Sequence, residues 1–207
     1  SGSIPNSGDV NLITHNGSFT GTAGFVLGTL PGRVTGNLVN TGTALALNVT
    51  GNDRVIWTGA AGAPPTGEAW DINTTANWKL QSTSAATNFL QGDDIIFDGT
   101  GANALNVTLN TVANPARAEF TNNTADATPD YIIKGSGGMG GSMILDKTGT
   151  GTVTLAPVQA PAVANTPAHP YAGATNIANG TLTLDYTGLT GANLGSSRVI
   201  SPVSAVS

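Results

Sequence analysis

The chain has 207 residues, of which 28 are Gly, 11 are Pro and only 9% are charged, whereas about a quarter of the residues in an average globular domain are charged. The absence of Cys excludes disulfides and thiol nucleophiles, and a net charge of −5 with seven Lys and Arg provides no basic surface for nucleic acid. The hydrophobic content of 39% is sufficient for a core, so we expect a folded chain and not a disordered one.

Short runs of apolar and β-branched residues, separated by Gly, Asn or Pro, recur along the whole chain. No stretch has the sustained 3.6-residue periodicity of a helix, and no apolar run reaches the ~18 residues of a membrane-spanning one. We therefore predict an all-β segment that does not insert into a membrane. The strands expected in chain order are 25–27, 44–49, 54–57, 94–97, 105–109, 131–133, 151–155 and 180–184.

A phrase in which a Gly turn precedes alternating apolar and Thr or Ala residues occurs at 40–47, 149–155 and 179–184. The first copy is one residue out of register with the other two. Thr152 and Thr181 are about 29 residues apart, a spacing typical of solenoid repeats, whose units stabilise one another by stacking. The pattern predicts a parallel β-helix with apolar side chains inside and Thr outside, and a β-sandwich remains the alternative.

The middle of the chain differs from this phrase, because all three Trp residues, together with Glu68, Asp71, Asp93 and Asp94, lie between Trp57 and Phe97. We interpret residues 57–98 as a Trp-containing boundary or capping segment. Residues 4–56 are then the end of a preceding β-repeat unit. Residues 99–207 form a β-helix repeat unit with an Ala- and Pro-rich loop insert at 157–170.

The order of motifs resembles autotransporter-type passenger proteins of Gram-negative bacteria. Their opening is similar to Trp57-Thr58-Gly59, Trp70-Asp71, Asn77-Trp78 and Gly92-Asp93-Asp94 in this chain. Their autotransporter-associated β-strand repeat is similar to residues 145–155 followed by 171–184. The resemblance implies a right-handed parallel β-helix exposed at the bacterial cell surface, outside the outer membrane, and associated with adhesion or display. It implies no catalytic residues.

Two groups of side chains are candidates for binding. Trp57, Trp70 and Trp78 could stack on sugar rings, although such residues also form cores and caps. Asp93, Asp94 and Asp98, with Glu68 and Asp71 upstream, supply the oxygen ligands that Ca²⁺ prefers, but without an EF-hand spacing; capping or turn chemistry is the competing interpretation. The two histidines, His15 and His169, are expected in exposed turns.

These features favour a non-catalytic structural or adhesive segment of a large secreted repeat protein, a stalk or display scaffold with no cofactor. Its expected partners are neighbouring repeats of the same polypeptide and a surface glycan or a host or matrix component. The alternative is a carbohydrate-binding module that uses the Trp-containing region or the 157–170 loop. A β-helix enzyme is a third possibility, but we expect none, since no pair of carboxylates stands in a recognisable catalytic arrangement.

Overall fold

The structure, a computed structural model, describes residues 7–17, 21–22, 24–30, 32–60, 66–100, 106–126, 130–158 and 168–189. Within these ranges the fold is all-β, and its other element is a short 3-10 turn, η1, at Thr66–Glu68. No helix in these ranges has the length and apolar character needed to cross a membrane. The chain forms two compact units, residues 1–53 and 54–207.

The first unit contains a three-stranded antiparallel sheet. Its strands are β1 (Gly8–Thr14), β2 (Val34–Asn40) and β3 (Ala44–Asn52), with β3 in the centre. A tight turn joins β2 to β3 at Gly42, whose φ of +88° suits glycine. The core of this unit comes mainly from the apolar residues of β3, because a central strand is covered by a neighbour on each side.

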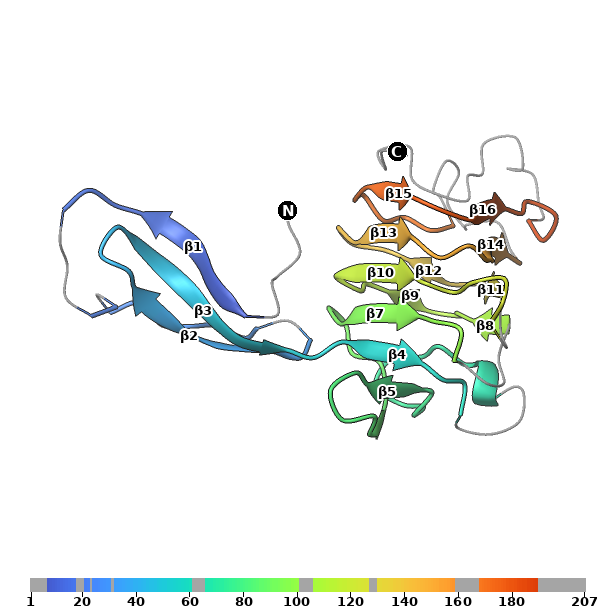
Figure 1. The fold of residues 1–207 in the computed structure, drawn as a ribbon, viewed down its shortest axis with the longest axis horizontal. Helices are drawn as coiled ribbons and strands as arrows, with labels where there is room; N and C mark the ends of the chain where they lie inside the picture. The colour runs from blue at the N-terminus through green and yellow to red at the C-terminus, as the bar shows by residue number, and fades with distance from the viewer. Residues whose placement is uncertain are drawn as a thin grey trace. The chain divides into compact units, whose positions relative to one another are not determined.

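The second unit is built on a seven-stranded sheet of order β15-β13-β10-β7-β4-β5-β6 (Figure 1). Five of its strands pair in parallel: β4 (Val55–Trp57), β7 (Asp94–Phe97), β10 (Arg117–Phe120), β13 (Ile144–Lys147) and β15 (Thr175–Ile177). The other two, β5 (Trp78–Leu80) and β6 (Ala86–Thr87), run antiparallel to their neighbours. The outer edge of β4 is therefore paired with β5 and not left open.

Two further sheets are wholly parallel. One has the order β16-β14-β11-β8 and contains β8 (Asn106–Thr108), β11 (Tyr131–Gly135), β14 (Thr152–Pro157) and β16 (Thr181–Leu184). The other pairs β9 (Val112–Ala113) with β12 (Gly138–Met139). From β7 to β12 the chain passes through the three sheets twice in the same order, so each strand pairs with its counterpart from the previous circuit (Figure 1).

The pairing of β14 with β16 is the one expected from the sequence spacing. It places Thr152 beside Thr181 and Val153 beside Leu182. Val153 is fully buried, Leu182 packs against the core, and Thr181 is exposed. The predicted alternation of inward apolar and outward Thr side chains is therefore confirmed for these strands.

Similar residues stack on one another inside the second unit. Phe97 lies on Phe120 in the neighbouring strand, with ring centroids 4.7 Å apart and planes inclined by 8°. In the next sheet Val107, Ile133 and Leu155 occupy equivalent positions on β8, β11 and β14. All five are buried in one cluster, so each added strand extends a continuous hydrophobic core.

The outer face of the seven-stranded sheet carries a ladder of ion pairs. Arg54 Nη2 lies 2.5 Å from Glu119 Oε2, and Arg54 Nε lies 3.5 Å from Asp94 Oδ2. Arg117 Nε lies 2.6 Å from Asp146 Oδ2. Burial raises the pKa of the Asp94 carboxyl, and Arg54 and Arg117 oppose this rise. Glu119 and Asp146 stand directly opposite each other on neighbouring strands, and their pairing with Arg54 and Arg117 offsets the repulsion between the two carboxylates.

A tight turn before β16 surrounds the amino group of Lys147. This lysine is fully buried and its Nζ donates a hydrogen bond to Gly149 O, while burial lowers its pKa. Gly180 has a φ of +72°, and a Cβ at this position would lie 2.4 Å from Gly149 O and 2.5 Å from Gly151 O. Because both the backbone angle and the space exclude a side chain, only glycine fits here.

The predicted strands are present in the structure except the one at 25–27. Val26 in that run is 90% exposed and is not paired in a sheet. The phrase at 40–47 also differs from expectation, because it belongs to the antiparallel first unit and not to the parallel sheets. Parts of the predicted 4–56 and 99–207 segments, including 190–207, lie outside the described residues.

Substitution of Gly180 tests the packing of the turn. Gly180→Ala should reduce the free energy of unfolding by about 2–4 kcal/mol, because it adds a steric clash to an unfavourable φ. Gly141→Ala is the matched control, since Gly141 has the same φ of +72° but its nearest Cβ neighbour is at 3.4 Å. The control should lose only about 1 kcal/mol. Urea unfolding measures both, and equal losses would contradict the assigned role of the carbonyl contacts.

Candidate functional site

The three tryptophans pack against one another inside the second unit. Trp57 is 0% exposed, and Trp70 and Trp78 are each 1% exposed. Trp78 meets Trp57 and Trp70 edge-on, with ring centroids 5.0 and 5.5 Å apart, and Phe97 contacts all three rings. Since sugar stacking needs an exposed ring face, these contacts do not support the predicted stacking platform. The rings form part of the core, the other interpretation of the sequence.

The three aspartates predicted as calcium ligands do not converge. Asp93 Oδ2 accepts a hydrogen bond from the backbone N–H three residues earlier, at 2.8 Å. Asp94 faces Arg54, and Asp98 Oδ1 accepts from the backbone N–H two residues later, at 2.9 Å. Asp93 and Asp98 flank β7, an extended separation of about 16 Å. Within the described part of the chain, no group of three or more His, Cys, Asp or Glu could hold a metal ion, so the calcium site is not supported.

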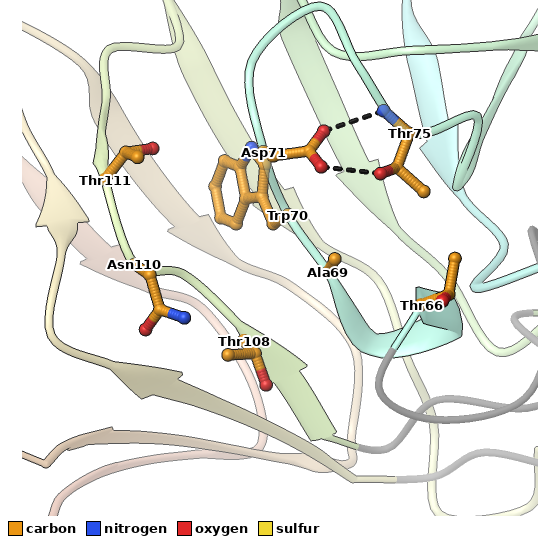
Figure 2. A pocket seen from close by; sticks show the side chains of 8 residues that line it. All are labelled: Thr66, Ala69, Trp70, Asp71, Thr75, Thr108, Asn110 and Thr111. Atoms are coloured by element: carbon orange, nitrogen blue, oxygen red, sulfur yellow. Dashed lines mark hydrogen bonds between the residues drawn. The ribbon is translucent and has the colours of Figure 1, made fainter.

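A pocket of about 360 Å³ lies beside the Trp cluster. Figure 2 shows that its lining comes from two stretches, one running from η1 to Thr75 and one from the end of β8 to Thr111. Backbone contacts join the two stretches: Ala69 forms a parallel bridge with Thr108, and Trp70 N donates to Thr108 O at 2.9 Å. The lining residues are Thr66, Ala69, Trp70, Asp71, Thr75, Thr108, Asn110 and Thr111.

Buried polar contacts hold the first stretch in place. Asn77 is fully buried, and its Nδ2 donates to Thr66 O at 2.6 Å and to Ala69 O at 2.8 Å. The two carboxylate oxygens of Asp71 accept from Thr75 N at 2.8 Å and from Thr75 Oγ1 at 2.5 Å (Figure 2). The wall of the pocket is therefore preformed and does not depend on a bound molecule for its shape.

Several polar groups of the lining make no hydrogen bond to the described residues. They are the hydroxyls of Thr66, Thr108 and Thr111 and the amide nitrogen of Asn110. Asn110 Oδ1, in contrast, accepts from Ser136 N at 3.2 Å, which orients the amide. Trp70 also belongs to the lining, and its Nε1 is buried and has no partner in the described part of the chain.

Sequence reasoning selected Trp70, Asp71 and Glu68 for other reasons and missed the rest of this pocket. Glu68 lies on η1, with Oε2 3.5 Å from Lys134 Nζ, and is not in the lining. Thr and Asn residues fill turns throughout the chain, so Thr108 and Asn110 carried no distinctive signal. The long-range bridge between the two stretches creates the pocket, and no local motif encodes it.

His169 is buried, which contradicts the expectation of an exposed turn. It is 2% exposed, and its Nδ1 accepts a hydrogen bond from Met139 N at 3.1 Å. Burial lowers the pKa of His169 to about 4. A protonated ring would carry hydrogen on Nδ1 and could no longer accept from Met139. His169 thus joins the end of the 157–170 insert to β12 through a contact that requires a neutral ring.

Comparison with known proteins identified no relative. No protein-family model, curated protein or solved structure matches the chain.

The pH dependence of stability tests the His169 contact. The pKa of His169 is about 6.5 in the unfolded chain and about 4 in the folded chain, so its contribution is fully present above pH 6.5 and is lost as pH falls towards 4. The loss should be about 3 kcal/mol by pH 4. His169→Asn keeps an acceptor for Met139 N and removes the titration. Urea unfolding of both proteins between pH 7 and 4 should therefore give diverging curves.

Asp94 has the opposite effect on stability as pH falls. Because its pKa is raised in the folded state, the folded state binds the proton more readily than the unfolded chain and is stabilised by acid. This contribution is present in both the parent and the variant, so it cancels in their difference. Parallel curves for the parent protein and His169→Asn would rule out a neutral buried His169.

Proposed function

We propose that this chain is a non-catalytic structural or adhesive segment of a large secreted or cell-surface repeat protein, in which it serves as a stalk or display scaffold. We also propose that the second unit is a right-handed parallel β-helix. The observation that supports both is the repeated passage of the chain through three sheets, with parallel pairing between successive circuits. A scaffold of this kind can be lengthened circuit by circuit without changing its cross-section.

The Trp-containing segment acts as the cap of this scaffold. An open strand edge invites pairing with other chains, and terminal units of repeat proteins need protection from it. Here β5 pairs with the outer edge of β4, and Trp78 on β5 packs on Trp57 of β4. The antiparallel direction of β5 breaks the parallel order, so the stack of circuits begins at β4.

The cell surface is the compartment that best fits this role. The resemblance to passenger proteins points to an extracellular location associated with the bacterial outer membrane. A chain without Cys cannot become cross-linked before export, and stacked Thr and Asn side chains keep its outer face polar without charge repulsion. The partners are neighbouring repeats of the same polypeptide and, for adhesion, a surface glycan or a host or matrix component.

A carbohydrate-binding module is the second candidate. The observation that favours it is the preformed pocket beside Trp70, whose hydroxyl and amide groups include several without a hydrogen-bond partner among the described residues. The other region considered for binding, the insert at 157–170, includes residues 159–167, which lie outside the described part of the chain.

Removal of one circuit tests the β-helix and the scaffold together. Deletion of residues 118–144 joins Arg117 to Leu145, which occupies the position equivalent to Ala118. Asp146 then takes the place of Glu119 beside Arg54, so this arginine keeps a carboxylate partner. The shortened chain should remain all-β by circular dichroism and unfold cooperatively. In the full-length gene product, the region beyond the scaffold should stay accessible to antibody on intact cells.

Deletion of residues 118–131 is the control, because it removes only half a circuit and joins Arg117 to Ile132 out of register. This chain should fail to fold and should not be displayed. If the whole-circuit deletion unfolds as readily as the half-circuit deletion, the β-helix proposal is wrong. If it folds but display is lost, the scaffold role is wrong.

A further inference from the structure

We propose that the pocket between η1 and the β8–β9 connection binds a neutral saccharide and recognises about one or two sugar units. This inference deepens the carbohydrate-binding candidate by assigning its site and ligand class, and it is independent of the scaffold role. The pocket volume of about 360 Å³ lies at the small end of the range for ligand sites, which suits a mono- or disaccharide and not an extended polymer.

The lining has the mixed character that a sugar requires. Its apolar lining comes from Trp70 and Ala69, and each Thr adds a methyl group beside its hydroxyl. A pyranose presents both C–H surfaces and hydroxyl edges, so it can use both kinds of contact. The Trp70 ring is almost completely buried and packs against other aromatic rings, so little of it is available for stacking. The pocket would therefore recognise the sugar mainly through hydrogen bonds to its hydroxyl groups.

The polar lining groups that have no hydrogen-bond partner among the described residues can form these hydrogen bonds to the sugar. The hydroxyls of Thr66, Thr108 and Thr111 can each donate or accept a hydrogen bond, and the Asn110 amide nitrogen can donate two. Thr108 follows Val107, a core residue of β8, so its outward side chain is held by a rigid strand. A hydroxyl on a strand keeps its position better than one on a loop, and we assign Thr108 the main positioning contact.

Charge excludes anionic ligands from this pocket. The Asp71 carboxylate lies in the wall, and Glu68 lies immediately before the lining residue Ala69. Lys134, which lies opposite the lining residue Thr108 on the neighbouring strand, is already paired with Glu68 at 3.5 Å. Both oxygens of Asp71 accept hydrogen bonds from Thr75, so a cationic ligand would find them partly occupied. A neutral, hydroxyl-rich molecule is the class that remains.

Titration of the whole chain with defined oligosaccharides tests the proposal. The probes are maltotetraose, cellotetraose, xylotetraose and mannotetraose, with tetragalacturonate as the anionic comparison. Three tryptophans give three indole N–H signals in an NMR spectrum, and that of Trp70 should shift selectively on binding. We expect at least one neutral probe to bind with a dissociation constant below about 1 mM, and tetragalacturonate to bind more weakly than that probe.

Two matched variants locate the contact. Thr108→Val and Thr154→Val each remove an outward hydroxyl from the same four-stranded sheet, but Thr154 does not line the pocket. Thr108→Val should weaken binding by about 5- to 10-fold, the value of one hydrogen bond, while Thr154→Val should leave it unchanged. The proposal is overturned if no neutral probe shifts Trp70, if Thr108→Val binds as tightly as the parent, or if tetragalacturonate binds best. None of these outcomes depends on the circuit deletions.

Discussion

Parallel pairing between equivalent residues of successive strands is the constraint on which the second unit depends. Each side chain must be compatible with the side chain at the equivalent position of the neighbouring strand, about 4.8 Å away. Apolar side chains meet this requirement by forming columns such as Val107, Ile133 and Leu155, and aromatic rings meet it by stacking, as Phe97 does on Phe120. The low charge of the chain follows from the same rule, since stacked like charges repel.

The charged residues of these strands are placed next to residues of opposite charge. Asp94, Arg117, Glu119 and Asp146 lie on neighbouring strands beside Arg54. Each is paired with an opposite charge, which offsets the repulsion between Glu119 and Asp146, the two carboxylates that stand directly opposite each other. Lys147 departs from this arrangement, because its column places it in the interior and its amino group is satisfied by a turn carbonyl. That contact explains the crowding at Gly180, so one buried cation constrains the shape of a whole turn.

The pocket lies where this regular order is interrupted. Its lining residues lie in the connection between β4 and β5, which includes η1, and in the stretch that starts at the end of β8. After β4 the chain leaves the repeated circuit, forms η1 and the antiparallel strands β5 and β6, and returns to the parallel sheet at β7. Regular strands present shallow outer faces, whereas an irregular connection laid across a strand end creates a concave surface. His169, which lies before β15, is linked to β12 because its neutral ring accepts a hydrogen bond from Met139 N.

The sequence by itself determined the all-β class, most strand positions and the pairing of β14 with β16, because alternation and repeat spacing are local and register follows from them. It did not reveal that residues 40–47 belong to an antiparallel sheet, since the same alternation suits either direction of pairing. Only the tertiary structure decided that Trp57, Trp70 and Trp78 are covered, that Asp93 and Asp98 are held apart by β7, and that Ala69 bridges to Thr108. Whether a side chain is buried, and which side chains come together in a site, depends on contacts between segments that are distant in the sequence. A single Trp, Asp or Thr carries no local signal of such contacts.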